Sequence, residues 1–529
     1  MSTFLNLPSP PLPPHLATLR AAALRQEPGS GFSTNIRPLR TRRTAAATSH
    51  GPDPLTNETM LQGFEWYVPA DGAHWRRLAR VLPALAGLGV SKLWIPPACK
   101  AASSEGNGYD LYDLWDLGEF EQKGGVATKW GTKGELEGLV EVAGGLGVRV
   151  LFDAVLNHKT GADFCEGIYA RRVDEKDRRV EVSTESEVGK ARKVETMLAW
   201  TGFNFPGRDG RYSEMRWKND HFTGVDYDYA TKKHGIWKLE GKEWADDVDE
   251  ELGNYDFLWV SLPSDPEHPE VKADLFRWVE WLPQQMKFGG LRLDAIKHYS
   301  FRFLRDFVTH IREHVDPDWF IVGEYWREDS EYLARFIEFM GHQISLFDVQ
   351  LVSNFSKVSS LGEQGDLTKV LDDSLTLWKP DNAVTFVVNH DTQAGQSLEL
   401  WAYGSQYDYF DDPRCVGFTR LGHHSKSGGH GLAVVMTNAW EYATKPMFVG
   451  RQHAGEAWTD LLRWCPGQVV IRDDGWGDFP VGHRSVAVWV NSQADDRAEV
   501  DTLVFDFDIY GDDHTQGAAP RETTLDETS

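Results

Sequence analysis

Cysteine is scarce in this chain. The 529 residues include only four cysteines, and none of them has the spacing of a CxxC pair: Cys99, Cys165, Cys415 and Cys465. This pattern excludes a zinc site built from paired cysteines and also a dense disulfide framework. Scattered cysteines are typical of proteins from a reducing compartment, so we expect a cytoplasmic protein.

The chain also lacks long apolar runs and an excess of basic residues. No run is long enough to cross a bilayer, and no apolar core follows a basic start, so neither membrane insertion nor export by a signal peptide is expected. Acidic residues outnumber basic residues by 80 to 55, which gives a formal net charge of −25. That charge argues against nucleic acid and anionic membranes as partners, and it suits a neutral polymer and bound cations.

Strand-like and helix-like segments alternate from about residue 58 onward. Trp75, Leu78, Leu82 and Leu85 recur at helical spacing within a predicted helix over residues 74–88, and a second helix is predicted over residues 132–146. The predicted strands are 60–67, 90–97, 148–156, 289–295, 319–324, 345–350 and 383–389. Apolar strands that alternate with helices predict a parallel sheet, and polar residues at their ends predict an α/β fold of the (β/α)8 TIM-barrel type.

Four of these strands end in charged or polar residues. Arg292 and Asp294 are two residues apart, so both side chains point to the same side of one strand. Taken alone, they favour a buried ion pair. The pattern recurs, however, and the four segments read FDAVLNH at 152–158, GLRLDAIKH at 290–298, IVGEYW at 321–326 and FVVNHD at 386–391. The recurrence indicates a catalytic site at the carboxyl ends of the strands.

These segments, in this order, resemble those of the α-amylase family of glycoside hydrolases (family 13). The likeness is to the branch of bacterial liquefying and fungal intracellular α-amylases. It extends to MLQGFEWY at 60–67, LWIPP at 93–97, GYDLYD at 108–113 and FVGRQHAGE at 448–456, and it covers residues 58–490. The resemblance implies retaining endo-hydrolysis of α-1,4-glucosidic bonds in starch, glycogen or maltooligosaccharides, by a protein that we expect to be a monomer.

The segments and the resemblance together predict five parts of the chain. Residues 1–57 are rich in Pro, Ser, Ala and Arg and are expected to be a disordered N-terminal extension. Short strands without helices after about residue 412 predict an antiparallel C-terminal domain. The expected parts are a barrel over 58–159 and 289–402, an inserted calcium-associated β domain over 160–288, a C-terminal β domain over 403–491 and an acidic tail over 492–529.

One barrel strand is missing from this pattern. The chain passes from Glu399 almost directly to Tyr403, whereas a βα unit needs about 30 residues or more. An unclosed barrel exposes two strand edges and part of its core, so we expect the chain as written to be insoluble or inactive. Either a segment has been lost from the sequence or the protein is a degenerate relative. Since both flanks keep the family pattern, the first interpretation is favoured.

The resemblance implies roles for three carboxylates. Asp294 corresponds to the nucleophile of the family, Glu324 to its acid/base and Asp391 to the third carboxylate, which binds sugar hydroxyls. Retaining hydrolysis needs one ionised carboxylate and one protonated carboxyl. For each of these residues, the structural alternative is a helix cap or an ion pair.

Other residues correspond to the substrate-binding and metal-binding positions of the family. The expected substrate-binding residues are Tyr109, Asp153, His158, Arg292, Lys297, His298, Trp326 and His390. The expected Ca²⁺ ligands are Asn157, Asp256 and the backbone carbonyl of His298, since oxygen ligands suit calcium. One family ligand is replaced within 260–265, unless Asp265 takes its place, so we expect weaker calcium binding.

Two other functions are compatible with the same sequence. A catalytically impaired or non-enzymatic α-glucan-binding relative would follow if the missing strand disables the barrel. An α-glucan transglycosylase would use the same carboxylates, because transfer differs from hydrolysis only in how well the acceptor side holds sugar against water. The sequence predicts α-amylase activity ahead of both.

Overall fold

The computed structural model describes residues 58–182, 194–249, 262–263, 268–361, 364–387, 389–391, 406–422 and 431–494. The chain divides into two compact units, Met1–Gly51 and Pro52–Ser529, and the first unit lies outside these ranges. The predicted N-terminal extension and most of the acidic tail therefore also lie outside the described residues. So does the stretch from Glu399 to Tyr403, where a barrel strand is predicted to be missing.

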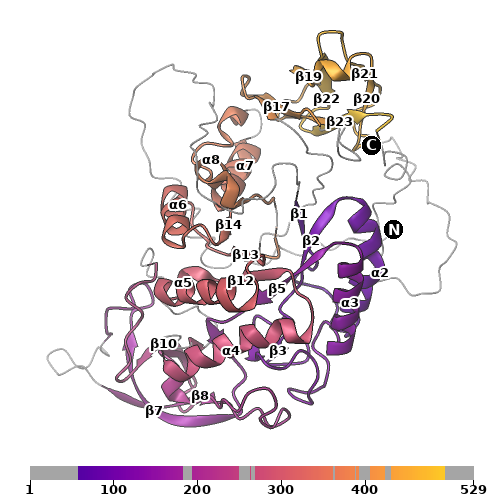
Figure 1. Cartoon of the computed structure of the whole chain (residues 1–529). Helices are drawn as coiled ribbons and strands as arrows, with labels where there is room; N and C mark the ends of the chain where they lie inside the picture. Colours follow the sequence, from indigo (N-terminus) through magenta and orange to yellow (C-terminus); the bar gives the residue numbers. More distant parts are fainter. Residues whose placement is uncertain are drawn as a thin grey trace, which may run out of the picture. The chain divides into compact units, whose positions relative to one another are not determined.

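The predicted parallel sheet is confirmed, and it has seven strands in the described part of the chain (Figure 1). Their spatial order follows the sequence: β1 (Thr59–Gln62), β2 (Val90–Trp94), β5 (Arg149–Ala154), β12 (Gly290–Leu293), β13 (Phe320–Gly323), β14 (Ser345–Phe347) and β15 (Ala383–Val384). All six pairings are parallel. This is the curled sheet of a (β/α) barrel, with strand ends gathered on one side.

Helices follow the strands and cover the sheet. They are α2 (His74–Gly87), α3 (Lys133–Gly145), α4 (Pro269–Gln285), α5 (Phe301–His310), α6 (Ser330–Phe339), α7 (Val349–Leu361) and α8 (Leu375–Trp378). Both predicted helices are confirmed as α2 and α3, which lie side by side (Figure 1). The Thr132 side chain caps α3 by accepting from the backbone N–H of Glu135. The Glu135 side chain accepts in turn from the backbone N–H of Thr132, so a capping box begins this helix.

Four predicted strands extend three residues or more past the observed end. Those predicted over 60–67 and 90–97 end at Gln62 and Trp94. The strand predicted over 345–350 ends at Phe347, because Asp348 accepts from the backbone N–H of Leu351 and starts α7. The strand predicted over 383–389 is limited to Ala383–Val384. Among the described strands, β15 pairs only with β14 and β1 pairs only with β2. The far side of β15 is where an eighth strand would continue the sheet.

The predicted insert is built mainly of antiparallel strands. Its four-stranded sheet has the order β8 (Glu195–Gly202), β7 (Phe164–Val173), β10 (Lys233–Leu239) and β9 (Gly224–Asp228). A short pair joins β6 (His158–Lys159) to β11 (Leu262–Pro263). The predicted insert ran to residue 288, but its last part forms α4, where Trp278 packs edge-on against Phe152 of β5 at 5.7 Å. Residues 269–285 therefore belong to the helical layer of the barrel.

The predicted antiparallel C-terminal domain is also found. One sheet has the order β16 (Gln406–Tyr409), β17 (Cys415–Arg420), β18 (Leu432–Thr437), β23 (Val486–Asn491), β20 (Ala457–Asp460) and β21 (Val469–Val470). A second pair joins β19 (Ala443–Phe448) to β22 (Trp476–Val481). Met447, Trp458, Phe479 and Trp489 are fully buried between them, so this domain has its own hydrophobic core.

Candidate active site

Arg292 lies at the centre of the predicted catalytic residues. Its Nη1 donates to Asp153 Oδ1 at 2.9 Å and to Asp294 Oδ1 at 2.7 Å, and its Nη2 donates to Glu324 Oε2 at 2.8 Å. Strand register explains the arrangement: Arg292 is paired with Asp153 on β5 and with Val322 on β13. One guanidinium therefore joins carboxylates from three adjacent strands, with charge-assisted hydrogen bonds at each.

Asp153 lies beneath this arrangement and is buried. Its Oδ2 accepts from Trp94 Nε1 and from the Tyr109 hydroxyl, both at 2.9 Å. Burial raises the pKa of Asp153 to about 6; the charge of Asp294 adds to the rise and Arg292 opposes it. All of this places Asp153 under the site as a support for Arg292 and Tyr109.

Asp294 and Glu324 stand at the carboxyl ends of β12 and β13. Ala295, next to Asp294, adopts a left-handed conformation with φ of 47°, which is uncommon for a residue other than glycine. This turn aims the Ala295 N–H at Glu324 Oε2, at 2.9 Å. A backbone donor and Arg292 therefore hold the same oxygen of Glu324, whose side chain remains 14% exposed.

Three aromatic rings are stacked in parallel beside the carboxylates. His390 is parallel to Tyr109, with centroids 5.0 Å apart, and to Trp66 at 6.1 Å. His390 is nearly buried, and burial together with the charge of Arg292 lowers its pKa to about 2. The imidazole is therefore neutral, and Gln62 Oε1 of β1 accepts from its backbone N–H at 3.3 Å.

Asp391 differs from the other two predicted catalytic acids in its surroundings. Its side chain is 47% exposed, whereas that of Asp294 is 7% exposed. Partial desolvation and the neighbouring charge of Glu324 raise the pKa of Asp391 to about 7. The neutral His390 ring is its neighbour, with Nε2 3.5 Å from Asp391 Oδ2.

The remaining predicted substrate-binding residues border the same site. His158 Nε2 lies 2.7 Å from the carbonyl oxygen of Tyr109. Lys297 Nζ lies 3.5 Å from the carbonyl oxygen of Trp326. This contact adds to the hydrogen bond between Arg292 and Glu324 as a second link between the ends of β12 and β13. His298 follows Lys297 and is buried.

Sequence reasoning missed two aromatic contributors. Trp94 ends β2 and supports Asp153, and Trp66 is 40% exposed beside Tyr109 and His390. Both fall within segments that carried the family resemblance, 93–97 and 60–67. Their positions at strand ends were the signal that could have identified them.

The predicted calcium ligands are only partly described. Asn157 and His298 are buried at the ends of β5 and β12, and β11 pairs with β6 immediately after Asn157. Asp256 and Asp265 lie outside the described residues. Within the described ranges, no group of three or more His, Cys, Asp or Glu side chains could hold a metal ion. Of the four predicted ligands, only Asn157 and His298 fall within the described residues.

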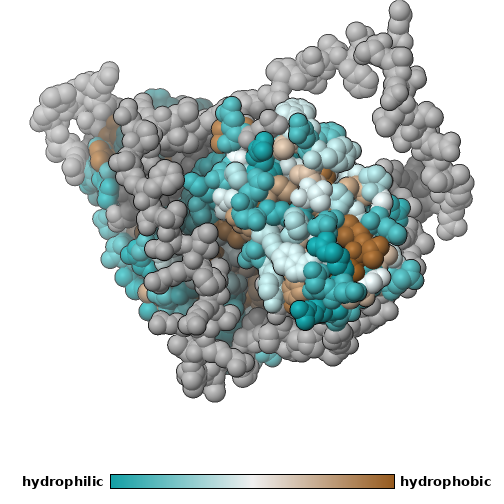
Figure 2. Space-filling model, turned by 90° about the horizontal axis from the view of Figure 1, so that it is seen from above, coloured by the Kyte–Doolittle hydropathy of each residue, from teal (hydrophilic) through white to brown (hydrophobic). Residues whose placement is uncertain are grey.

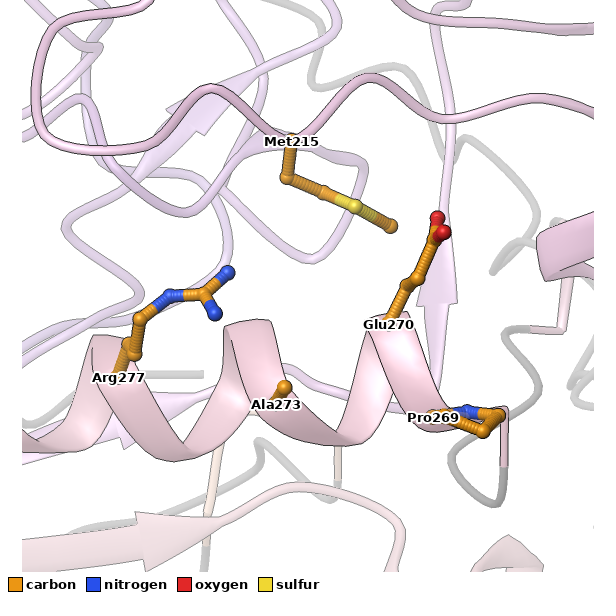
Figure 3. A pocket seen from close by; sticks show the side chains of 5 residues that line it. All are labelled: Met215, Pro269, Glu270, Ala273 and Arg277. Carbon is orange, nitrogen blue, oxygen red and sulfur yellow. The ribbon is translucent and has the colours of Figure 1, made fainter.

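A hollow of about 360 Å³ lies along α4 and shares no residue with this site (Figure 3). Pro269, Glu270, Ala273 and Arg277 line one face of the helix, and Met215 faces them from the neighbouring loop. The acid cluster around Arg292 is thus separate from this hollow, and the strand ends remain the candidate site.

Comparisons with known proteins agree with this geometry. The α-amylase catalytic-domain family matches residues 71–197. An α-amylase of Bacillus licheniformis is 39% identical over 490 residues, covering 82% of this chain and 93% of the relative. The cytoplasmic α-amylase of Escherichia coli K12 is 31% identical and covers 82% of this chain and 99% of the relative. A crystal structure of an Anoxybacillus α-amylase has a TM-score of 0.51 at 14% identity and covers 83% of this chain and 98% of its own, which supports the fold.

The lengths of these matches bear on the missing strand. The stretch aligned with the Bacillus licheniformis protein is 490 residues long, which exceeds the 82% of this 529-residue chain that takes part in it. The same holds for the 504 residues aligned with the Escherichia coli protein. Both relatives therefore carry residues that have no counterpart in this chain.

Proposed function

The chain belongs to the α-amylase family of glycoside hydrolases and is an endo-acting α-1,4-glucan hydrolase; on that premise we propose that Asp294 is its nucleophile and Glu324 its acid/base. The observation that carries the proposal is the Arg292 guanidinium, which binds both carboxylates and Asp153 at 2.7–2.9 Å. This cation holds the two carboxylates together at the ends of β12 and β13.

The reaction proceeds in two displacements. Asp294 attacks the anomeric carbon while Glu324 gives its proton to the glycosidic oxygen, so the bond to the leaving sugar breaks and a glucosyl ester on Asp294 forms. Glu324, now ionised, then takes a proton from water, and that water attacks the same carbon and releases Asp294. Two inversions give net retention of the α configuration.

Other residues bind and position the sugar. Tyr109 offers a ring face, steadied by Asp153 below and His390 beside it. Asp391, half exposed at the mouth of the site, is placed to accept hydrogen bonds from sugar hydroxyls. His158, His390, Lys297, His298 and Trp326 complete the proposed contacts. Because the Asp153 oxygens accept from Trp94, Tyr109 and Arg292, we assign Asp153 to positioning in place of the predicted sugar contact. We assign Arg292 to orienting Asp294, through the hydrogen bond between them.

We extend the proposal to a Ca²⁺ ion at the junction of the insert and the barrel. Asn157 would supply an amide oxygen and His298 a backbone carbonyl oxygen, and both donor types suit calcium. Asp256, with Asp265 in place of a lost family ligand, would complete the set. The ion would fix the insert on the strand ends that carry Asp294.

The proposed setting is the cytoplasm, where the protein would act as a monomer on starch, glycogen or maltooligosaccharides. All four cysteines are free thiols, and one relative is named a cytoplasmic α-amylase. Among the described residues, no helix is long and apolar enough to cross a membrane. Subcellular fractionation with antibodies to the chain checks the location, and protein recovered from the medium or from mitochondria would contradict it.

The mechanism is tested by trapping and by stereochemistry. A fluorinated α-glucosyl fluoride should accumulate as an ester, and peptide mass spectrometry should place the added mass on Asp294. Proton NMR of maltooligosaccharide cleavage should show the α-anomer first. An ester on any other residue, or initial β-anomer, would contradict the assignment. Transfer products at low sugar concentration would favour the transglycosylase alternative.

A further inference from the structure

Three aromatic side chains of the C-terminal domain are more than 60% exposed: Trp464, at 65%, follows β20, and the other two share one turn. Trp440 is 63% exposed and Tyr442 is 69% exposed, and both lie in the turn between β18 and β19. On the face of the molecule in Figure 2, hydrophobic residues form only a few small patches among hydrophilic ones. Large aromatic residues are more often buried, so two exposed rings within three residues need an explanation other than core packing.

Strand pairing fixes this turn beside another one. β18 pairs with β23 and β19 pairs with β22, both antiparallel, so the turns 438–442 and 482–485 lie at the same end of the domain. Two backbone bonds join them: Thr437 N–H donates to Ser485 O at 3.0 Å, and Arg484 N–H donates to Ala439 O at 2.8 Å. The turn that carries the aromatic rings is thus anchored at its base.

Each exposed ring also has a partner from the second turn. The Arg484 guanidinium lies over the Trp440 ring, 4.5 Å from its centroid. The His483 ring meets Tyr442 edge to face, with centroids 6.1 Å apart. Cation–π and edge-to-face contacts restrict the two side chains. Rings that are restricted before binding lose less conformational entropy when a ligand stacks on them.

We propose that Trp440 and Tyr442, with Arg484, form a second α-glucan-binding site on the C-terminal domain, away from the carboxylates of the barrel. The inference rests on the α-glucan hydrolase function. Glucose rings present apolar C–H faces that stack on aromatic rings, and Arg484 offers donors to sugar hydroxyls. The net charge of −25 disfavours an anionic ligand, whereas a neutral glucan meets no such repulsion.

A second site would act through polymer length. A long glucan can occupy this site and the barrel site together, and the first contact raises the local concentration of the chain for the second. A short maltooligosaccharide can occupy only one of them. Loss of the aromatic pair should therefore weaken binding of glycogen and slow its hydrolysis, without changing the cleavage of short substrates.

Affinity electrophoresis in gels that contain glycogen tests the inference. The background is a soluble form of the full chain, with the missing unit restored if the 529-residue form does not stay in solution, and with Glu324→Gln to prevent cleavage. In that background the double substitution Trp440→Ala and Tyr442→Ala should raise the Kd for glycogen by about tenfold, or about 1.4 kcal/mol. The control is Tyr169→Ala, a residue of similar exposure (64%) on the inserted sheet, which should leave retention unchanged.

A second measurement needs no change in the aromatic pair. In the Glu324→Gln chain, excess glycogen should slow hydroxyl-radical oxidation of Trp440 several-fold and leave that of Tyr169 unchanged, as measured by peptide mass spectrometry. Unchanged retention of the double variant, or equal oxidation of Trp440 with and without glycogen, would overturn the proposal. Equal loss of retention in Tyr169→Ala would also overturn it, because the effect would then not belong to this surface.

Discussion

The two sides of the active site are held in different ways. On one side, Asp153, Asp294 and Glu324 are fixed by Arg292, and every residue of β12 is buried between β5 and β13. On the other side, His390 and Asp391 follow β15, which is only half-buried, and His390 contacts Gln62 of β1, which is also only half-buried. Hydrogen bonds from adjacent parallel strands support the first side, while side-chain stacking and Gln62 support the second.

The difference shows what a complete barrel contributes to catalysis. A strand paired on both edges fixes the register of the side chains at its end, as it does for Arg292 and Asp294. A strand paired on one edge leaves the residues after it to find other partners. In the described part of the chain, β1 and β15 are both such strands. Of the three predicted catalytic acids, Asp391 is therefore the one that follows a strand paired on one edge among the described strands.

The largest effect is expected from a substitution on the side of the site that is held by Arg292, called the rigid side below. Asp294→Asn should lower the rate of soluble-starch hydrolysis by at least about 10³-fold, because the amide cannot form the glucosyl ester. His390→Ala should lower it by only about 10–100-fold, since a neutral ring that binds sugar contributes a few hydrogen-bonding and stacking contacts. Reducing-sugar assays with both variants measure the contrast.

Circular dichroism provides the control for this pair, and Asp294→Asn should fold like the parent. The assays use a form of the chain that is active, with the missing unit restored if the parent rate is too low to measure. Substantial activity of Asp294→Asn would remove the proposed mechanism. Equal losses in the two variants would remove the contrast between the two sides.

Restoring the missing unit should have the next largest effect. Unpaired buried amide and carbonyl groups cost a few kcal/mol each, and a whole domain is stable by only about 5–15 kcal/mol. We therefore expect the 529-residue chain to be insoluble or nearly inactive. A form with about 50 residues of a related βα unit inserted between Glu399 and Tyr403 should be soluble and at least about tenfold more active.

A matched control separates closure from added length. A Gly/Ser segment of the same length at the same position should not restore activity, because it supplies neither strand nor helix. Expression of the three forms side by side decides the matter. A soluble, fully active 529-residue chain would show that the barrel closes by another route.

The sequence predicted the side of the site that is held by Arg292 well, and the side formed by β1 and β15 less well. Arg292 and Asp294 share a strand with period two, and strand order then places Asp153 and Glu324 beside them, so local pattern determined the geometry. The extent of β15 was overestimated because the apolar run 383–388 looks like a strand, whereas pairing depends on neighbouring strands and β15 pairs with β14 alone among the described strands.

Other features required the three-dimensional structure. The hydrogen bonds from Trp94 and Tyr109 to Asp153 join three separate segments, and no spacing in the sequence reveals them. The assignment of residues 269–285 to the barrel depended on the packing of Trp278 against Phe152, which is also a contact between distant segments. Local patterns predict elements, but contacts of this kind are determined by the packing of the whole domain.

A smaller effect concerns Asp391 and pH. Its pKa is raised from the ordinary value of 3.8 to about 7 in the folded chain. The folded chain therefore binds more protons than the unfolded chain between about pH 4 and pH 7, and the free energy of unfolding falls as the pH rises through that window. Asp391→Asn removes the charge, so it should stabilise the protein above pH 7 by about 1–2 kcal/mol, allowing for solvent screening of a half-exposed group.

Melting curves at pH 5 and pH 8 measure this effect. The gain in melting temperature of Asp391→Asn over the parent should be larger at pH 8 than at pH 5. A gain that is equal at the two pH values, or larger at pH 5, would contradict the raised pKa. It would also remove the distinction between the exposed third carboxylate and the buried side of the site.

The smallest effect is expected from metal removal. It tests what else stabilises the rigid side, because the proposed Ca²⁺ site lies there, at the ends of β5 and β12. With one family ligand replaced, the ion should stabilise the protein by only about 1 kcal/mol, so excess chelator should lower the melting temperature by about 2–4 °C and added Ca²⁺ should restore it. In Asn157→Ala, chelator should have no further effect, and Mg²⁺ should not replace Ca²⁺ in the parent, because it demands a smaller octahedral site. An unchanged melting curve of the parent in excess chelator would mean that the hydrogen bonds around Arg292 fix this side without a metal ion.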